Sequence, residues 1–302
     1  MDAALRKSLA GISGILVTPF DGADNVAPAR LAPIVDRAIA AGVHMLVANG
    51  NTGEFYGLTT AEAEKMVHAA AELVAGRVPL IGGVGKSVGD ACALARASRA
   101  AGARVLMVHQ PPDPFVAPRG VVEYVKRVAD AGDGLPIMLY LRNDAIGLDA
   151  IEALTQVPGV AGVKWACPTP MRLAEAIRRC APDIVWVDGL AEPWAPPFYA
   201  VGARGFTSGL INVWPAQSVA IHRALDAGDY DEAGKLIGVM APFEEVRAEE
   251  MSGTNVTGVK AALQLIGNDC GPTRPPSAWP LDDRQMSKMR ASLARWGLPV
   301  KD

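Results

Sequence analysis

A single lysine stands in the middle of an apolar run, "VAGVKWAC" at residues 160–167. The run predicts a buried strand, and a lysine is almost never fully buried without a partner or a task. Burial disfavours the charged amine, so it lowers the pKa of a lysine. A neutral amine can attack a ketone and form a Schiff base, which withdraws electrons while a neighbouring bond is made or broken. Lys164 is therefore the first catalytic candidate. The alternatives are a lysine whose charge reaches solvent at the strand end, or one paired with Asp188.

Schiff-base chemistry also requires a proton shuttle and donors for the carboxylate of a 2-oxo acid. Tyr140, in "PIMLYLR" at 136–142, occupies a position on the preceding run comparable to that of Lys164. Its hydroxyl, relayed by a threonine, could move protons. The loop "GNTGE" at 50–54 offers backbone N–H groups and the Thr52 hydroxyl. Equally, Tyr140 could be a core aromatic, and the loop could simply mark a turn.

The elements that would position these residues follow one pattern. Short apolar runs alternate with Ala-rich stretches that have the periodicity of amphipathic helices. The runs are 14–20, 44–50, 78–85, 104–110, 136–142, 160–166, 184–190 and 202–209. Continuous apolar runs indicate parallel strands buried on both faces. Eight of them predict an α/β fold, a (β/α)8 TIM barrel, over a doubly wound open sheet.

After about residue 215 the strand pattern stops. We expect a (β/α)8 catalytic domain over residues 1–218 and a C-terminal helical region over 219–302. Helices are predicted within 216–250, 255–267 and 282–297, with a Pro-rich connector at 270–281.

Active sites of this fold lie at the carboxyl ends of the strands. The polar residues expected there are Asn49–Glu54, His109, Gln110, Tyr140, Arg142, Lys164, Asp188 and Thr207–Asn212. Glu54 is expected to anchor its loop, and His109 to be a satisfied polar residue more readily than a base. Asp188 could orient a loop or support Lys164.

Composition excludes several functional classes. The 302 residues carry a net charge of −3, which gives no electrostatic case for nucleic acid or an anionic membrane. No apolar run is long enough to span a membrane, and the amino terminus lacks a signal-peptide pattern. The four cysteines lack CxxC or metal-ligand spacing, which favours free thiols and a cytoplasmic protein.

One stretch imitates a nucleotide site. "GVGKS" at 83–87 ends like a phosphate-binding loop, but the glycine that the motif requires five positions before Gly85 is Leu80. We expect a strand that ends in a tight glycine turn, with Lys86 exposed. No cofactor and no metal are predicted.

Five segments together resemble the dihydrodipicolinate synthase/N-acetylneuraminate lyase family. They are "GNTGEFYGLTTAEAEKMV", "IMLYLRN", "GVKWA", "GARGFTSGLINVWP" and "GPTRPPSAWPL", in order along essentially the whole chain. The resemblance implies a barrel with a C-terminal helical region, a homotetramer or dimer, and a class I, metal-independent lyase acting on pyruvate or another 2-oxo acid. By position, Lys164 would form the Schiff base, Tyr140 would shuttle protons, and Thr52 would supply the adjacent hydroxyl.

The chain departs from the synthase pattern in its substrate contacts. The synthases have two threonines in the glycine loop, and this chain has Asn51 at the position of the first. Where the synthases have a relay tyrosine, this chain reads "HQPPDPF", residues 109–115. In the synthases an arginine holds the carboxylate of aspartate semialdehyde, and this chain has Ala145 at that position. An arginine appears three residues earlier, at Arg142. Loss of a charge partner for a buried carboxylate is costly. "YLRNDA" and "ANGNTGEFYGLT" are closer to the sugar-acid dehydratases, such as 5-dehydro-4-deoxyglucarate dehydratase.

The sequence therefore predicts a Schiff-base lyase for a 2-oxo deoxy sugar acid. A genuine 4-hydroxy-tetrahydrodipicolinate synthase and a non-catalytic barrel that binds a small acid are the alternatives. Asn51, Thr52 and Gly53 are expected to hold the 2-oxo carboxylate, and Arg142 with His109 to contact the distal end. Ser208 and Asn212 are expected to shape the pocket from the eighth strand.

Overall fold

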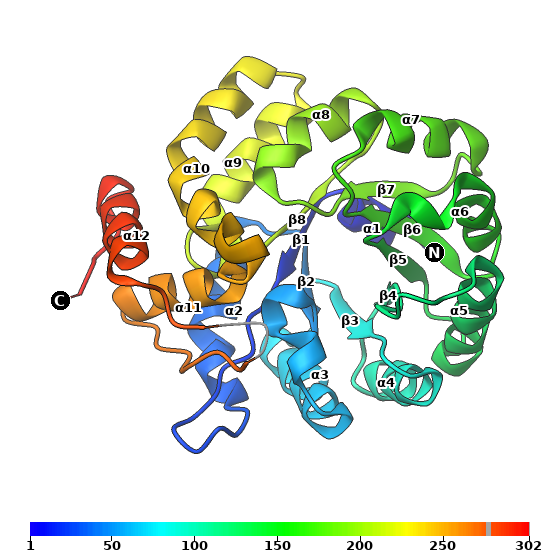
Figure 1. Cartoon of the computed structure of the whole chain (residues 1–302), viewed down its shortest axis with the longest axis horizontal. Coiled ribbons are helices and arrows are strands. Elements are labelled where there is room, and N and C mark those ends of the chain that lie inside the picture. The colour runs from blue at the N-terminus through cyan, green and yellow to red at the C-terminus, as the bar shows by residue number, and fades with distance from the viewer. Residues whose placement is uncertain (276–278, 302) are drawn as a thin grey trace.

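The computed structural model describes residues 1–275 and 279–301, and it contains a closed barrel of eight parallel strands in chain order (Figure 1). The strands are β1 (Ile12–Ile15), β2 (Met45–Ala48), β3 (Leu80–Val84), β4 (Val105–His109), β5 (Ile137–Leu141), β6 (Val160–Trp165), β7 (Val185–Asp188) and β8 (Phe206–Ser208). Almost all of their side chains are buried, as strands covered on both faces require. The predicted (β/α)8 TIM barrel is confirmed.

The first strand differs from its predicted run, 14–20. It begins two residues earlier and ends at Ile15. The Leu16 N–H still donates to the Val47 carbonyl of β2 at 3.0 Å. The later residues leave the sheet, because Pro19 has no N–H to give to a ladder and the Phe20 N–H donates to the Cys270 carbonyl at 2.9 Å.

Helices cover the barrel and extend it on one side. They are α1 (Ala3–Leu9), α2 (Ala32–Ala41), α3 (Thr60–Val74), α4 (Val88–Ala100), α5 (Pro118–Gly132), α6 (Leu148–Thr155), α7 (Pro170–Arg179), α8 (Ala195–Ala200), α9 (Pro215–Asp226), α10 (Tyr230–Ser252), α11 (Asn255–Leu265) and α12 (Asp283–Arg295). The sequence pattern does not predict α1. Its Leu5 and Leu9 pack among the apolar side chains that fill the barrel interior. None of the helices in the described residues has the length and apolar character needed to cross a membrane.

The C-terminal helices α10, α11 and α12 lie together beside the barrel (Figure 1), which confirms the predicted helical extension. Residue 218 falls within α9, so the boundary between residues 1–218 and 219–302 stays a prediction. Within the Pro-rich connector, residues 276–278 lie outside the described part of the chain.

The "GVGKS" stretch forms the end of β3 and the start of α4. The Ser87 hydroxyl caps α4 by accepting the Asp90 N–H at 3.1 Å. Lys86 is half-buried, so the expectation of an exposed lysine is wrong. Its amine lies 5.3 Å from the Phe55 ring centroid and donates to the Leu58 carbonyl, because the left-handed backbone at Lys86 turns the side chain back onto the preceding loop.

Glu54 anchors its loop to the C-terminal region, as the sequence predicts. Its Oε1 accepts from the Lys260 amine of α11 at 2.5 Å, and its Oε2 accepts from the Arg274 N–H at 2.8 Å. Both charged side chains of the Glu54–Lys260 pair are buried. Removal of one partner from a buried pair leaves an uncompensated charge in the interior.

We therefore expect Lys260→Met to lower the free energy of unfolding by about 3–5 kcal/mol, because Glu54 would remain buried without its cation. Urea unfolding followed by circular dichroism measures the change. The double variant Glu54→Gln, Lys260→Met should recover most of the loss, since it removes both charges. A single variant as stable as the wild type would contradict this account of the loop.

Candidate active site

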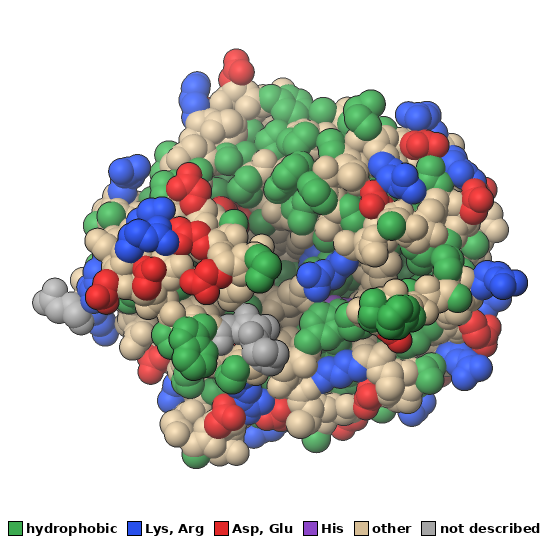
Figure 2. Space-filling model, viewed as in Figure 1, with side chains coloured by type: hydrophobic (Ala, Val, Ile, Leu, Met, Phe, Trp, Pro, Cys, Tyr) green, Lys and Arg blue, Asp and Glu red, His purple; other side chains and the backbone are tan. Residues whose placement is uncertain are grey.

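A cavity of about 490 Å³ opens at the carboxyl ends of the strands. Figure 2, drawn from the same side as Figure 1, shows the surface hollowed between the barrel and the C-terminal helices. The barrel contributes Asn51, Thr52, Tyr140, Arg142, Lys164 and Thr207 to the lining. The site therefore lies where the fold predicts it.

The sheet register brings the central residues into one row. His109 of β4 is paired with Tyr140 of β5, and Tyr140 is paired with Lys164 of β6. The three side chains therefore lie at the same level inside the barrel, because in-register residues of neighbouring parallel strands point the same way. This arrangement confirms the expected convergence of Lys164 and Tyr140.

Lys164 is only 3% exposed, and its amine lies 3.9 Å from the Tyr140 ring centroid. Burial lowers the pKa of Lys164 to about 7, opposed by the charge of Asp188 and assisted by that of Arg142. The side chain does not reach solvent, and Asp188 is not within ion-pair distance of it. Neither structural alternative for this lysine holds, and a large fraction of the amine is neutral near pH 7.

Tyr140 presents a protonated phenol next to that amine. Its hydroxyl oxygen accepts from the Asn51 side-chain amide at 3.0 Å. Burial raises the pKa of Tyr140 to about 12, so the phenol keeps its proton at neutral pH. Since the hydroxyl oxygen is the acceptor in this contact, its O–H remains free to donate toward the cavity.

His109 lies behind Tyr140 and is absent from the cavity lining. Its Nε2 donates to the Asn49 carbonyl at 3.0 Å, which leaves Nδ1 to accept from the Tyr56 hydroxyl at 3.3 Å. The ring stacks on Phe55 with 4.3 Å between centroids. Burial lowers the pKa of His109 to about 3, so it is neutral, with both nitrogens occupied. The geometry gives His109 a supporting position rather than contact with a ligand.

The glycine loop meets the cavity through two of its residues. Asn51 and Thr52 line the cavity, while Gly53 does not. The Gly53 carbonyl accepts from the Thr18 hydroxyl at 2.6 Å. A Cβ at Gly53 would come within 2.9 Å of the Leu16 carbonyl oxygen, so this position has room only for glycine.

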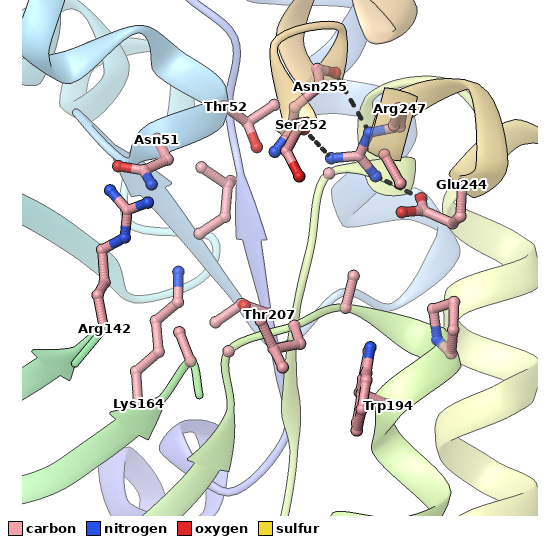
Figure 3. A pocket seen from close by; sticks show the side chains of 18 of the residues that line it. Asn51, Thr52, Arg142, Lys164, Trp194, Thr207, Glu244, Arg247, Ser252 and Asn255 are labelled. Atoms are coloured by element: carbon pink, nitrogen blue, oxygen red, sulfur yellow. Dashed lines mark hydrogen bonds and ion pairs between the residues drawn. The ribbon is translucent and has the colours of Figure 1, made fainter. Parts of the chain in front are cut away.

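Arg142 lies on the same side of the cavity as the glycine loop. In Figure 3 its guanidinium is beside Asn51 and above Lys164. Its side chain is exposed and lies 6.0 Å from the Tyr140 ring centroid. Arg142 makes no ion pair with any residue that the structure describes, so its charge is available to an acid in the cavity.

Ser208 and Asn212 lie outside the cavity lining. Alternation along β8 turns Thr207 toward the cavity and Ser208 away from it, where the Ser208 hydroxyl donates to Glu192 at 2.5 Å. The Asn212 side chain donates to the Ile15 carbonyl at 2.8 Å. The two residues therefore fix the wall of the site from behind.

Five further polar residues line the cavity from the C-terminal helices: Glu244, Glu245, Arg247, Ser252 and Asn255. The sequence does not identify them as site residues, because they belong to no motif and the sequence pattern predicts an uninterrupted helix for α10. Their position depends on a break in α10 at Glu249–Met251, which only the structure reveals. Among the residues described, no group of three His, Cys, Asp or Glu side chains has an arrangement suited to a metal ion.

Comparison with known proteins places this geometry in a family. The profile of the Dihydrodipicolinate synthetase family matches residues 8–295. The chain is 31% identical to a probable 5-dehydro-4-deoxyglucarate dehydratase of Rhizobium rhizogenes, over 90% of this chain and 91% of that protein. It is 33% identical to an uncharacterized DapA-like lyase of Halobacterium salinarum, over 96% and 95%. The crystal structure of dihydrodipicolinate synthase from Bacillus clausii superimposes with a TM-score of 0.93 at 34% identity, covering 97% of this chain and all of that one.

The lowered pKa of Lys164 predicts how its reactivity depends on pH. Reductive methylation with formaldehyde and cyanoborohydride should label Lys164 half-maximally near pH 7, because only the neutral amine reacts. Solvent-exposed lysines should be labelled half-maximally only near the ordinary pKa of lysine, about 10.4. In Arg142→Gln the half-maximum should move to higher pH, since a positive charge that disfavours protonation is gone.

Peptide mass spectrometry across a pH series measures both midpoints in one sample. Labelling of Lys164 that rises only together with the exposed lysines would contradict the desolvated environment described for it.

Proposed function

The chain belongs to the dihydrodipicolinate synthetase family, and on that premise we propose that it is a class I, metal-independent lyase in which Lys164 forms a Schiff base with a 2-oxo acid. One observation carries the proposal: a buried lysine whose pKa is lowered to about 7 lies against a protonated tyrosine, in a row of in-register polar residues that crosses β4–β6. The iminium supplies the electron sink for bond cleavage or loss of water, so the step requires no cofactor.

The proposed sequence starts with attack of the Lys164 amine on the 2-oxo carbon. The nitrogen loses a proton and the carbinolamine oxygen gains one, with the Tyr140 hydroxyl as the shuttle and Thr52 beside it. Water then leaves, and the carbon–nitrogen double bond forms. Asn51 supports this role because its amide holds the Tyr140 oxygen.

The carboxylate of the 2-oxo acid is placed at the glycine loop. The Asn51 and Thr52 side chains face the cavity there, and the loop backbone lies behind them. The helical turn Asn51–Gly53 and its N–H groups favour an anion at this end of the cavity. Gly53 contributes by keeping the loop close to the barrel, not by facing the ligand.

For the substrate we propose a deoxy sugar acid, because several relatives are named as probable 5-dehydro-4-deoxyglucarate dehydratases. Arg142 supports the choice because it offers an unpaired cation in the cavity. The alternative, 4-hydroxy-tetrahydrodipicolinate synthase, is less supported, because Ala145 presents no charge for the carboxylate of aspartate semialdehyde.

We also propose a cytoplasmic homo-oligomer, a tetramer or dimer. All four cysteines are free thiols, which fits a reducing compartment. Phe115 is 92% exposed and Met171 is 74% exposed, and large apolar side chains at a surface are typical of subunit contacts. Light scattering coupled to size-exclusion chromatography measures the assembly.

Borohydride reduction in the presence of pyruvate should leave a covalent adduct on Lys164 of the wild-type protein. Lys164→Ala should give no adduct and no turnover while its circular dichroism spectrum stays unchanged, because no other side chain in the row is an amine. Intact mass followed by peptide mapping identifies the site. Substantial turnover by the folded variant would refute the mechanism.

Dehydration of 5-dehydro-4-deoxyglucarate should exceed condensation of pyruvate with aspartate semialdehyde by at least about 100-fold in kcat/KM, since a missing charge partner is worth about 3 kcal/mol. Parallel assays on one preparation measure the ratio. A ratio in favour of condensation would replace the proposed substrate with that of the synthase and leave the Schiff base unaffected.

A further inference from the structure

The far wall of the cavity is built by the C-terminal helices rather than by the barrel. Figure 3 shows Lys164 and Arg142 on one side, with Glu244, Arg247 and Asn255 facing them from the other. The wall comes from α10, whose last residue is Ser252, and from Asn255 at the start of α11. A short acid such as pyruvate, held at the glycine loop and Lys164, has no atoms to reach it.

Arg247 is the fixed centre of this wall. It is 5% exposed, and its guanidinium donates to the Asn255 side-chain oxygen at 2.6 Å, to the Asn255 carbonyl at 3.3 Å and to the Glu244 carboxylate. A Cβ at Gly209 would come within 2.4 Å of the guanidinium, so the loop after β8 leaves room for it only because it has a glycine there. A guanidinium has five N–H groups, and two of these five have no acceptor among the residues that the structure describes.

Other groups of the wall also lack protein partners. Among the residues described, no hydrogen bond is made by the second carboxylate oxygen of Glu244, the side-chain nitrogen of Asn255, or the hydroxyls of Ser252 and Thr207. All of them belong to residues that line the cavity. The wall therefore presents donors and an acceptor side by side, and Glu244 already neutralises the charge of Arg247.

The backbone that carries this wall is strained. Glu250, Met251 and Ser252 follow one another in the left-handed region, at φ of 53°, 56° and 65°, although none is a glycine. The Thr254 hydroxyl holds the turn by contacts at 2.5 Å to the Val246 carbonyl and 3.0 Å to the Glu249 carbonyl. Strain of this kind persists where the surrounding structure enforces it, and it is concentrated at ligand sites.

We infer that Glu244, Arg247, Ser252 and Asn255 form a subsite for the hydroxyl groups on the tail of the 2-oxo acid; the inference rests on the proposed Schiff-base function. A hydroxyl both donates and accepts, so it satisfies an Arg247 N–H and the free Glu244 oxygen together. A bare carboxylate can only accept, and it would meet the charge of Glu244. The unpaired cation of the cavity, Arg142, lies on the opposite side.

The test compares three acids by borohydride trapping on Lys164: pyruvate, 2-oxohexanoate, and 2-oxo-3-deoxygluconate, which has the same chain length with hydroxyls. The measured quantity is the concentration that gives half-maximal adduct. Wild type should require at least about tenfold less of the hydroxylated acid than of 2-oxohexanoate, the equivalent of 1.4 kcal/mol. Glu244→Leu and Asn255→Ala should each reduce that preference at least threefold.

Glu232→Leu is the matched control, since Glu232 is on the same helix outside the cavity lining, and the one partner of its carboxylate among the described residues is Lys235, at 3.6 Å. Its preference should equal that of wild type, and thermal melts show that each variant is folded. A preference retained in both wall variants, or absent in wild type, overturns the subsite. If none of the three acids labels Lys164, the Schiff-base proposal fails and the subsite proposal falls with it. Equal labelling by all three overturns the subsite alone.

Discussion

The site depends on the removal of one amine from water. Lys164 is surrounded by the barrel interior, where a charged ammonium has neither solvent nor a carboxylate in contact with it. The face of the Tyr140 ring, 3.9 Å away, is the surface that it meets instead. The other two residues of the row, His109 and Tyr140, are subject to the same constraint. Each must be able to form hydrogen bonds and yet be uncharged, because a buried charge would need a partner. The raised pKa of Tyr140 and the lowered pKa of His109 meet that condition.

Much of the fold and the centre of the site could be predicted from residues alone. Continuous apolar runs fix parallel strands, and a lysine and a tyrosine at equivalent positions of neighbouring runs must converge once the barrel closes. The sequence is less informative about which side of a strand a residue faces, because adjacent residues of a strand point in opposite directions. Thr207 faces the cavity and Ser208 faces Glu192, and the eight residues 202–209 contain no signal that separates them.

The rest could not be predicted because it depends on contacts between distant segments. His109 has its two nitrogens occupied by Asn49 and Tyr56, which both lie in the segment that follows β2. The far wall depends on backbone angles at Glu250–Ser252 that propensity disfavours for residues other than glycine. The local sequence pattern predicts helices and strands. It does not predict a turn that tertiary packing forces into an unfavourable backbone conformation.

The C-terminal helices hold the glycine loop through the Glu54–Lys260 pair and supply the wall that faces Lys164. The row of Tyr140 and Lys164 is thus encoded in the barrel, and the wall that faces it is encoded in a later stretch of the chain. Substitutions confined to this wall would leave the desolvated amine in place, so a lineage could exchange one acid for another while its chemistry is inherited intact. For an engineer, the same separation defines a library: vary 244–255, and keep the barrel unchanged.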